Sequence, residues 1–200
     1  MTIGLRSTET ILAMSTKIRN AVKEDIKKVF DIATSRALDK NTLVGAKNSG
    51  FLVSSYSEKD YYNLFQRADF FLIAEKAAET IGFLIAYSPK AFNKNEWLNY
   101  TVAKSYNYNC LVIKQVATIY GVKGVGTALY RSIIESTAVP LFAAIVAEPE
   151  NLASIALHTK TGFQSIALLK PNDGILRNVW ATKEPITPLP SMTEQAATKS

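Results

Sequence analysis

Three closely spaced glycines are the residues whose pattern indicates chemistry most directly. Gly121, Gly124 and Gly126 follow an apolar run at 111–119 and precede an amphipathic pattern at 127–135. A strand that turns through glycines into a helix exposes backbone N–H groups at the positive end of the helix dipole. Because glycine lacks a Cβ and tolerates positive φ, an anion can approach that backbone closely. The segment therefore predicts a binding site for a phosphate or pyrophosphate.

The glycine spacing separates several kinds of phosphate loop. A P-loop requires Gly-Lys-Ser/Thr, which does not follow here. The dinucleotide-binding fingerprint is G-x-G-x-x-G, whereas this chain has the two gaps in the reverse order. Glu148 lies 22 residues after Gly126, about where a ribose-binding acid is expected, so a nucleotide-binding domain stays open. A coenzyme A pyrophosphate loop and a turn that only packs a helix on a sheet are the other interpretations.

A second motif follows the next apolar run, at 141–147. From Glu148 to Phe163 the chain reads EPENLASIALHTKTGF. This segment resembles the motif Asn-x-x-Ser-x-x-x-(Tyr/His)-x-x-x-Gly-Phe of the GNAT acetyltransferase superfamily. The glycine loop resembles that superfamily's (Arg/Gln)-x-x-Gly-x-(Gly/Ala) motif, with Gly121 at the usual Arg or Gln position. The two motifs stand in the expected order, about 25 residues apart. The chain is therefore similar to GNAT domains over about 16–183.

The resemblance implies both a fold and a reaction. The fold is α/β (α+β): a mixed, mostly antiparallel central sheet of about seven strands, flanked by about four helices. The reaction is acetyl transfer from acetyl-CoA to a primary amine of a small molecule or peptide by direct attack. The alternative is a catalytically silent acyl-CoA-binding regulatory domain. Acetyl-CoA (coenzyme A) and an amine are the expected partners, and homodimers are common in the family. No metal ligands are predicted, and the identity of the amine is left open.

The resemblance also implies cofactor-binding residues in one strand, the glycine loop and the second motif. They are Val116, Ala117, Thr118, Gly121, Val122, Lys123, Gly124, Val125, Gly126, Thr127, Asn151 and His158. The strand is expected to supply a backbone N–H for the thioester oxyanion. The loop amides are expected to bind the pyrophosphate. Asn151 is expected to bond the pantetheine arm, and its alternative role is an ordinary helix N-cap.

His158 and Glu148 are the expected catalytic residues. A lysine-like amine is almost fully protonated at pH 7, so direct attack requires loss of a proton. Glu148, at the carboxyl end of a predicted strand, is the expected base, with Asp31 and Glu75 as alternatives. His158 is the only histidine and stands where the family often has a tyrosine that protonates the leaving thiolate. Imidazole can donate a proton near neutrality, although a histidine here can also merely shape the cofactor groove.

The composition is that of one ordinary globular domain. The 200 residues are 48% hydrophobic and 20% charged, which excludes a disordered chain. No apolar run approaches the roughly 18 residues of a membrane helix, so no membrane partner is expected. A single cysteine, Cys110, excludes an intrachain disulfide and fits a cytoplasmic location. The net charge of +6 is spread along the chain with no basic arm, so no nucleic acid is expected.

The remaining pattern positions these motifs. We expect a loose leader at 1–15, in which Met14 is a second candidate start beside Met1, a domain at 16–183 and a disordered tail at 184–200. The predicted order is β-α-α-β-β-β-α-β-α-β-β. The expected elements are strand 17–21, helix 23–38, helix 57–67, strands 70–75 and 80–87 around a four-residue loop, strand 111–119, helix 127–135, strand 140–147, helix 151–161 and a hairpin of 163–169 and 175–181. Residues 88–109 are expected to form a long, aromatic loop.

Overall fold

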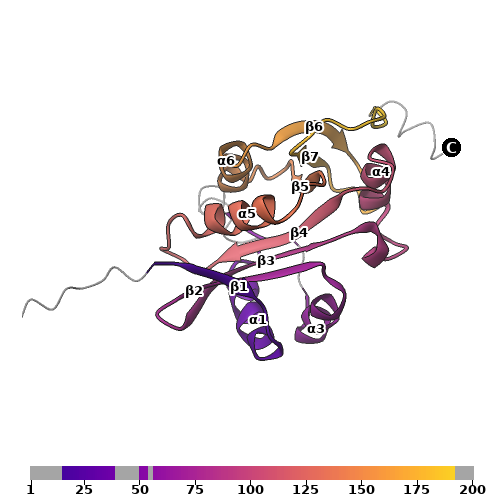
Figure 1. Ribbon diagram of the computed structural model, residues 1–200. Helices are drawn as coiled ribbons and strands as arrows, with labels where there is room; N and C mark the ends of the chain where they lie inside the picture. The colour runs from indigo at the N-terminus through magenta and orange to yellow at the C-terminus, as the bar shows by residue number, and fades with distance from the viewer. Residues whose placement is uncertain (1–14, 39–49, 54–55, 192–200) are drawn as a thin grey trace, which may run out of the picture.

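The computed structural model describes residues 15–38, 50–53 and 56–191. Seven strands form one sheet in the order β1-β2-β3-β4-β5-β7-β6 (Figure 1). They are β1 (Lys17–Asn20), β2 (Phe70–Lys76), β3 (Glu79–Tyr87), β4 (Leu111–Thr118), β5 (Leu141–Val146), β6 (Gln164–Leu169) and β7 (Arg177–Ala181). Of these seven strands, only β4 and β5 pair in parallel. The predicted mixed, mostly antiparallel sheet is confirmed.

Five α-helices are present among the described residues, where about four were expected. They are α1 (Ile26–Ser35), α3 (Glu58–Arg67), α4 (Trp97–Ser105), α5 (Val125–Ser136) and α6 (Leu152–Lys160), with short 3-10 turns at Lys23–Asp25 and Pro89–Ala91. Figure 1 shows α1 and α3 on one face of the sheet and α5 on the other. Each face has its own buried apolar cluster. No described helix has the length and apolar character needed to span a membrane.

Helix α4 is the element that the sequence prediction missed, because 88–109 was expected to be a loop. Leu98, Val102 and Tyr106 are spaced four residues apart and are all buried. They belong to the same cluster as Phe142 of β5, so the helix is held by tertiary packing against the sheet. Its other positions mix polar residues with two aromatic residues and one alanine, and the apolar stripe is therefore weak in the sequence alone.

The hairpin between β2 and β3 is tighter than expected. Its loop is the pair Ala77 and Ala78, with φ of 52° and 62°, rather than four residues. Positive φ at both central positions is the geometry of a type I′ turn, which matches the twist of the flanking strands. The sequence lacks the Asn-Gly signal that normally marks this turn. The other predicted elements are present with ends shifted by a few residues.

The chain after β7 docks on α4, although a disordered tail was expected from residue 184. The N–H groups of Ile186 and Thr187 both donate to the Ser105 carbonyl, at 2.8 and 3.1 Å. The Tyr106 hydroxyl donates to the Lys183 carbonyl at 2.6 Å. Leu189 packs against the buried cluster on this face. Residues 192–200, and residues 1–14 of the expected leader, lie outside the described residues.

Two truncations of the C-terminal segment should therefore differ in their effect on the free energy of unfolding. We expect removal of 185–200 to lower the free energy of unfolding by about 1–2 kcal/mol, because it deletes two backbone hydrogen bonds and the Leu189 contact. Removal of 192–200 alone leaves these contacts in place and is expected to cost less. Urea unfolding of both truncated chains checks this, and equal stability of the two would contradict the docking.

Candidate active site

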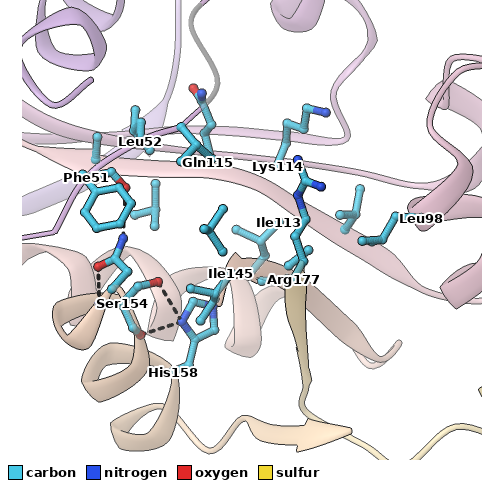
Figure 2. A pocket seen from close by; sticks show the side chains of 18 of the residues that line it. Phe51, Leu52, Leu98, Ile113, Lys114, Gln115, Ile145, Ser154, His158 and Arg177 are labelled. Atoms are coloured by element: carbon cyan, nitrogen blue, oxygen red, sulfur yellow. Dashed lines mark hydrogen bonds between the residues drawn. The ribbon is translucent and has the colours of Figure 1, made fainter. Parts of the chain in front are cut away.

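The candidate site is the gap that opens between β4 and β5. The two strands pair only at Leu111 with Leu141 and at Val112 with Phe142, near their start. Beyond this point they separate, and a cavity of about 470 Å³ lies between their carboxyl-terminal halves and α6 (Figure 2). Six of the residues expected to bind the cofactor line it: Val116, Ala117, Thr118, Gly126, Asn151 and His158.

The backbone of β4 presents N–H groups to this gap. The Ile119 N–H donates to the Ile81 carbonyl at 2.9 Å, so it faces β3. N–H directions alternate along a strand, and the N–H of Ala117 therefore also faces β3. Those of Val116 and Thr118 face the gap, where β5 no longer pairs with β4. Of the three expected strand positions, these two can offer a donor to an oxyanion or a pantetheine amide.

The glycine loop has the geometry of an anion site. Gly121 and Gly124 have φ of 79° and 78°, and a Cβ added at either would meet nothing within 4 Å. Gly124 is the N-cap of α5 and has no side chain to cap it. By contrast, Ser57 caps α3 and Asn151 caps α6 with side-chain oxygens. The N–H groups that begin α5, at 125–127, are therefore left for an external acceptor.

The other loop positions have distinct environments. A Cβ on Gly126 would lie 3.2 Å from the Leu157 side chain, so this glycine allows α5 and α6 to approach. Val122 is half-buried and packs against the cluster beneath α5. Lys123 is exposed next to the loop backbone, where its charge can attract a phosphate. Gly126 thus has a packing role that the spacing alone did not reveal.

Asn151 is the N-cap of α6, which was its alternative interpretation. Its Oδ1 accepts from the Ser154 N–H at 3.1 Å, and its Nδ2 donates to the Phe51 carbonyl at 3.0 Å. The side chain lines the cavity even though only 6% of the residue is exposed. It therefore fixes both the start of α6 and segment 50–53 beside the gap, and its contact with a cofactor stays a prediction.

His158 is buried, with 2% exposure, among α5, α6 and the sheet. Its Nδ1 lies 2.7 Å from the Ser154 carbonyl, which can only accept, so Nδ1 carries the proton. Its Nε2, 2.8 Å from the Tyr130 hydroxyl, then accepts from that hydroxyl. Burial lowers the pKa of His158 to about 4, against a smaller opposing effect of the Ser154 hydrogen bond. At neutral pH the imidazole is neutral and Nε2 has no proton to give, which disfavours the expected acid role.

The rings around His158 support the groove-shaping interpretation. Those of Tyr130 and Phe163 both meet the imidazole edge-on, with centroids 5.1 Å away. Burial raises the pKa of Tyr130, so its hydroxyl stays protonated as the donor to Nε2. The sequence analysis missed Tyr130 because an aromatic residue on the apolar side of a helix is normally core.

The structure does not bring the expected bases to the cavity. Glu148 is exposed in the turn after β5 and is not among the cavity-lining residues. Asp31 pairs with Lys27, and Glu75 pairs with Arg19, both away from the gap. Among the described residues, the carboxylates that do line the cavity are Glu96 and Asp173. Each forms a salt bridge with a basic residue that also lines it.

The Glu96–Lys114 pair was missed by the sequence analysis. Lys114 Nζ lies 2.8 Å from Glu96 Oε1, and the side chains are 21% and 13% exposed. Burial raises the pKa of Glu96, but the charge and hydrogen bonds around it, chiefly from Lys114, hold it below its usual value. The single charged residue of β4 was the available signal, although its partner lies 18 residues away and could not be identified.

Comparison with known proteins agrees on the fold. No protein-family model matches this sequence, and no curated protein does so either. Three similar solved structures are Ard1 from Thermoplasma volcanium, the ribosomal-protein-S18-alanine N-acetyltransferase from Escherichia coli, and the aminoglycoside acetyltransferase AAC(6')-Ib in complex with coenzyme A and kanamycin.

The similarity extends over most of each chain but is low in sequence. Ard1 has a TM-score of 0.57 at 17% identity, covering 82% of this chain and 95% of its own. The S18-alanine enzyme has 0.57 at 17%, covering 89% and 98%. AAC(6')-Ib has 0.59 at 16%, covering 93% and 100%. Together with the strand order and the separation of β4 from β5, these similarities show that this chain has the fold of the GNAT acetyltransferases.

Proposed function

We propose that this protein is a cytoplasmic N-acetyltransferase that transfers the acetyl group of acetyl-CoA to a primary amine by direct attack. The observation that carries the proposal is a pair of features that follow one another along the chain, at the end of β4 and the start of α5. The gap between β4 and β5 leads to backbone donors at Val116 and Thr118, and the uncapped start of α5 lies after the same strand. An elongated thioester with a pyrophosphate at one end suits that pair of sites.

The residues present fit acetyl-CoA, which supplies an acetyl group activated as a thioester. The amides of 121–127 would hold the pyrophosphate, since no Cβ at Gly121 or Gly124 fills the approach. The N–H groups of Val116 and Thr118 would orient the pantetheine arm and stabilise negative charge on the carbonyl oxygen. Asn151 and His158 would shape the wall opposite β4, His158 as a neutral ring fixed by Tyr130 and Ser154.

The acceptor amine must lose a proton before it attacks, and this step requires a base. Glu96 is a poor base because Lys114 and Tyr87 both donate to its Oε1. Glu148 therefore stays the proposed base and would act through water, because it is exposed outside the cavity. Glu148→Gln is the direct test, since it removes the basic group and preserves side-chain volume.

A turnover screen tests the proposed function as a whole. We expect the protein to release coenzyme A from acetyl-CoA only when an acceptor amine is present, in a panel of amino acids, amines and peptides. Calorimetry with acetyl-CoA is run in parallel. Binding without turnover of any amine would favour the silent acyl-CoA-binding domain. Binding of NAD with no binding of acetyl-CoA would favour the nucleotide-binding alternative and overturn the proposal.

A further inference from the structure

Two basic side chains reach the cavity from opposite walls. Lys114 comes from β4 and Arg177 from β7 (Figure 2). Both line the cavity, as do Glu96 and Asp173. The proposed acetyl transfer uses neither base, because the amides of β4 and of the glycine loop serve the cofactor. Their placement therefore needs a separate explanation.

A β-bulge places Lys114 at the wall of the cavity. Ile85 pairs with Gln115 and Ala86 pairs with Ile113, which leaves Lys114 as the extra residue of β4. Consecutive strand residues normally face opposite sides of a sheet, but a bulge can turn two of them to one side. Lys114 and Gln115 accordingly contact two neighbouring rings, whose centroids are 5.7 Å apart. Lys114 Nζ lies 5.8 Å from the Tyr56 ring centroid, and Gln115 accepts from the Tyr61 hydroxyl.

Lys114 retains donors after its salt bridge is formed. An ammonium group has three N–H donors, and among the described residues Lys114 uses one, to Glu96 Oε1 at 2.8 Å. Glu96 is more fully engaged, since its Oε1 also accepts from the Tyr87 hydroxyl and its Oε2 accepts from the Asn93 N–H. The carboxylate thus anchors the lysine, while the lysine can still donate to a further acceptor.

Arg177 is held in a similar way on the other wall. Its two terminal nitrogens donate to both oxygens of Asp173, at 2.9 and 2.7 Å, and one of them also donates to the Ile175 carbonyl. The Arg177 side chain is 18% exposed, whereas that of Asp173 is 48% exposed. Figure 2 shows the Arg177 side chain extending from β7 into the cavity. Its guanidinium is fixed in direction and keeps donors for a ligand.

The charges of the described lining favour an anion over a polycation. Lys114 and Arg177 keep N–H donors beyond their salt bridges with Glu96 and Asp173, and His158 is neutral. Both acids are already in salt bridges. A polyamine would need acids without partners and would place its charges beside Lys114 and Arg177, where like charges repel.

We propose that Lys114 and Arg177 bind a carboxylate of the acceptor, so that the substrate is a small amine bearing a carboxylate, such as an α-amino acid. This inference rests on the proposed acetyl transfer. The cavity also has room for an acceptor of that size beside a thioester, at about 470 Å³. The bulge of β4 and the segment that leads into α4 would then determine specificity, because they place and anchor Lys114.

Matched acceptors test the proposed class. Amino acids are compared with the corresponding amino alcohols, which keep the side chain and an amine of similar basicity but lack the carboxylate. We expect kcat/KM to be at least tenfold higher for the amino acids, about 1.4 kcal/mol. Equal rates, a preference for spermidine or kanamycin, or a preference for O-phosphoethanolamine would each overturn the inference while leaving the acetyltransferase proposal standing. Absence of acetyl-CoA binding would instead overturn the proposed function.

Variants test the two residues. Arg177→Met and the double variant Lys114→Met with Glu96→Gln should each raise KM for the amino acid at least tenfold, with KM for acetyl-CoA unchanged. The double variant avoids leaving a buried carboxylate without its partner. Lys90→Met, an exposed lysine away from the cavity, is the control and should behave like the wild type. A preference for amino acids that survives both variants would show that other residues bind the carboxylate.

Discussion

Gly124→Val is expected to weaken acetyl-CoA binding by at least tenfold, which corresponds to about 1.4 kcal/mol. Gly124 has a φ of 78°, and nothing lies within 4 Å of the position of its missing Cβ. A valine side chain would occupy that open space and keep phosphate oxygens away from the N–H groups at the start of α5. Isothermal calorimetry with acetyl-CoA measures the change directly.

Gly162→Val is the matched control for this substitution. Gly162 follows α6, has a φ of 86° and also has nothing within 4 Å of an added Cβ. It lies after the C-terminal end of α6, whereas Gly124 is the N-cap of α5. Both variants place a β-branched residue in the left-handed region and should lose similar stability, on the order of 1–2 kcal/mol. Only Gly124→Val should lose affinity, and wild-type affinity in a folded Gly124→Val protein would refute the loop assignment.

The stability of the protein should depend on the ionisation of its only histidine. The folded pKa of His158 is about 4, lowered by burial, whereas an unfolded histidine titrates near 6.5. Between these values the unfolded chain binds the proton and the folded chain does not, so stability falls as pH decreases from 6.5 to 4. Above pH 6.5 the contribution of the neutral ring is fully present. The expected loss over this window is about 3 kcal/mol.

Two measurements separate the effect of His158 from that of the carboxylates that titrate in the same pH range. The free energy of unfolding is measured from pH 4 to pH 7 for the wild type and for His158→Gln, which removes the titrating ring. Between pH 4 and pH 7, the free energy of unfolding of the wild type should rise by about 3 kcal/mol relative to that of the variant. Proton NMR of the single imidazole should show no titration above pH 5. A difference independent of pH, or a midpoint near 6.5, would restore His158 as a candidate proton donor.

The strand–loop–helix unit at the glycines could be predicted from the sequence because its determinants are local. A β-branched run, glycines that permit positive φ and an amphipathic helix each act within a few residues. The order of elements followed from the same kind of pattern and from the resemblance to GNAT domains, and the sheet agrees with it. Helix α4 did not follow, because burial of Leu98, Val102 and Tyr106 against β5 and β7 stabilises it more than its own pattern does.

The ionisation and orientation of the site residues were decided by the tertiary structure. His158 has the right residue type for an acid, but its burial and its contact with Tyr130, 28 residues away, make it a neutral acceptor. Glu148 has the right place along the chain, but its turn leaves it exposed. In the sequence Lys114 is only the one charged residue of its strand, and the bulge and the salt bridge with Glu96 place it at the wall of the cavity. Proton affinity and hydrogen-bond direction depend on neighbours that only the folded chain brings together, so sequence spacing located the glycine loop but could not assign the chemistry beside it.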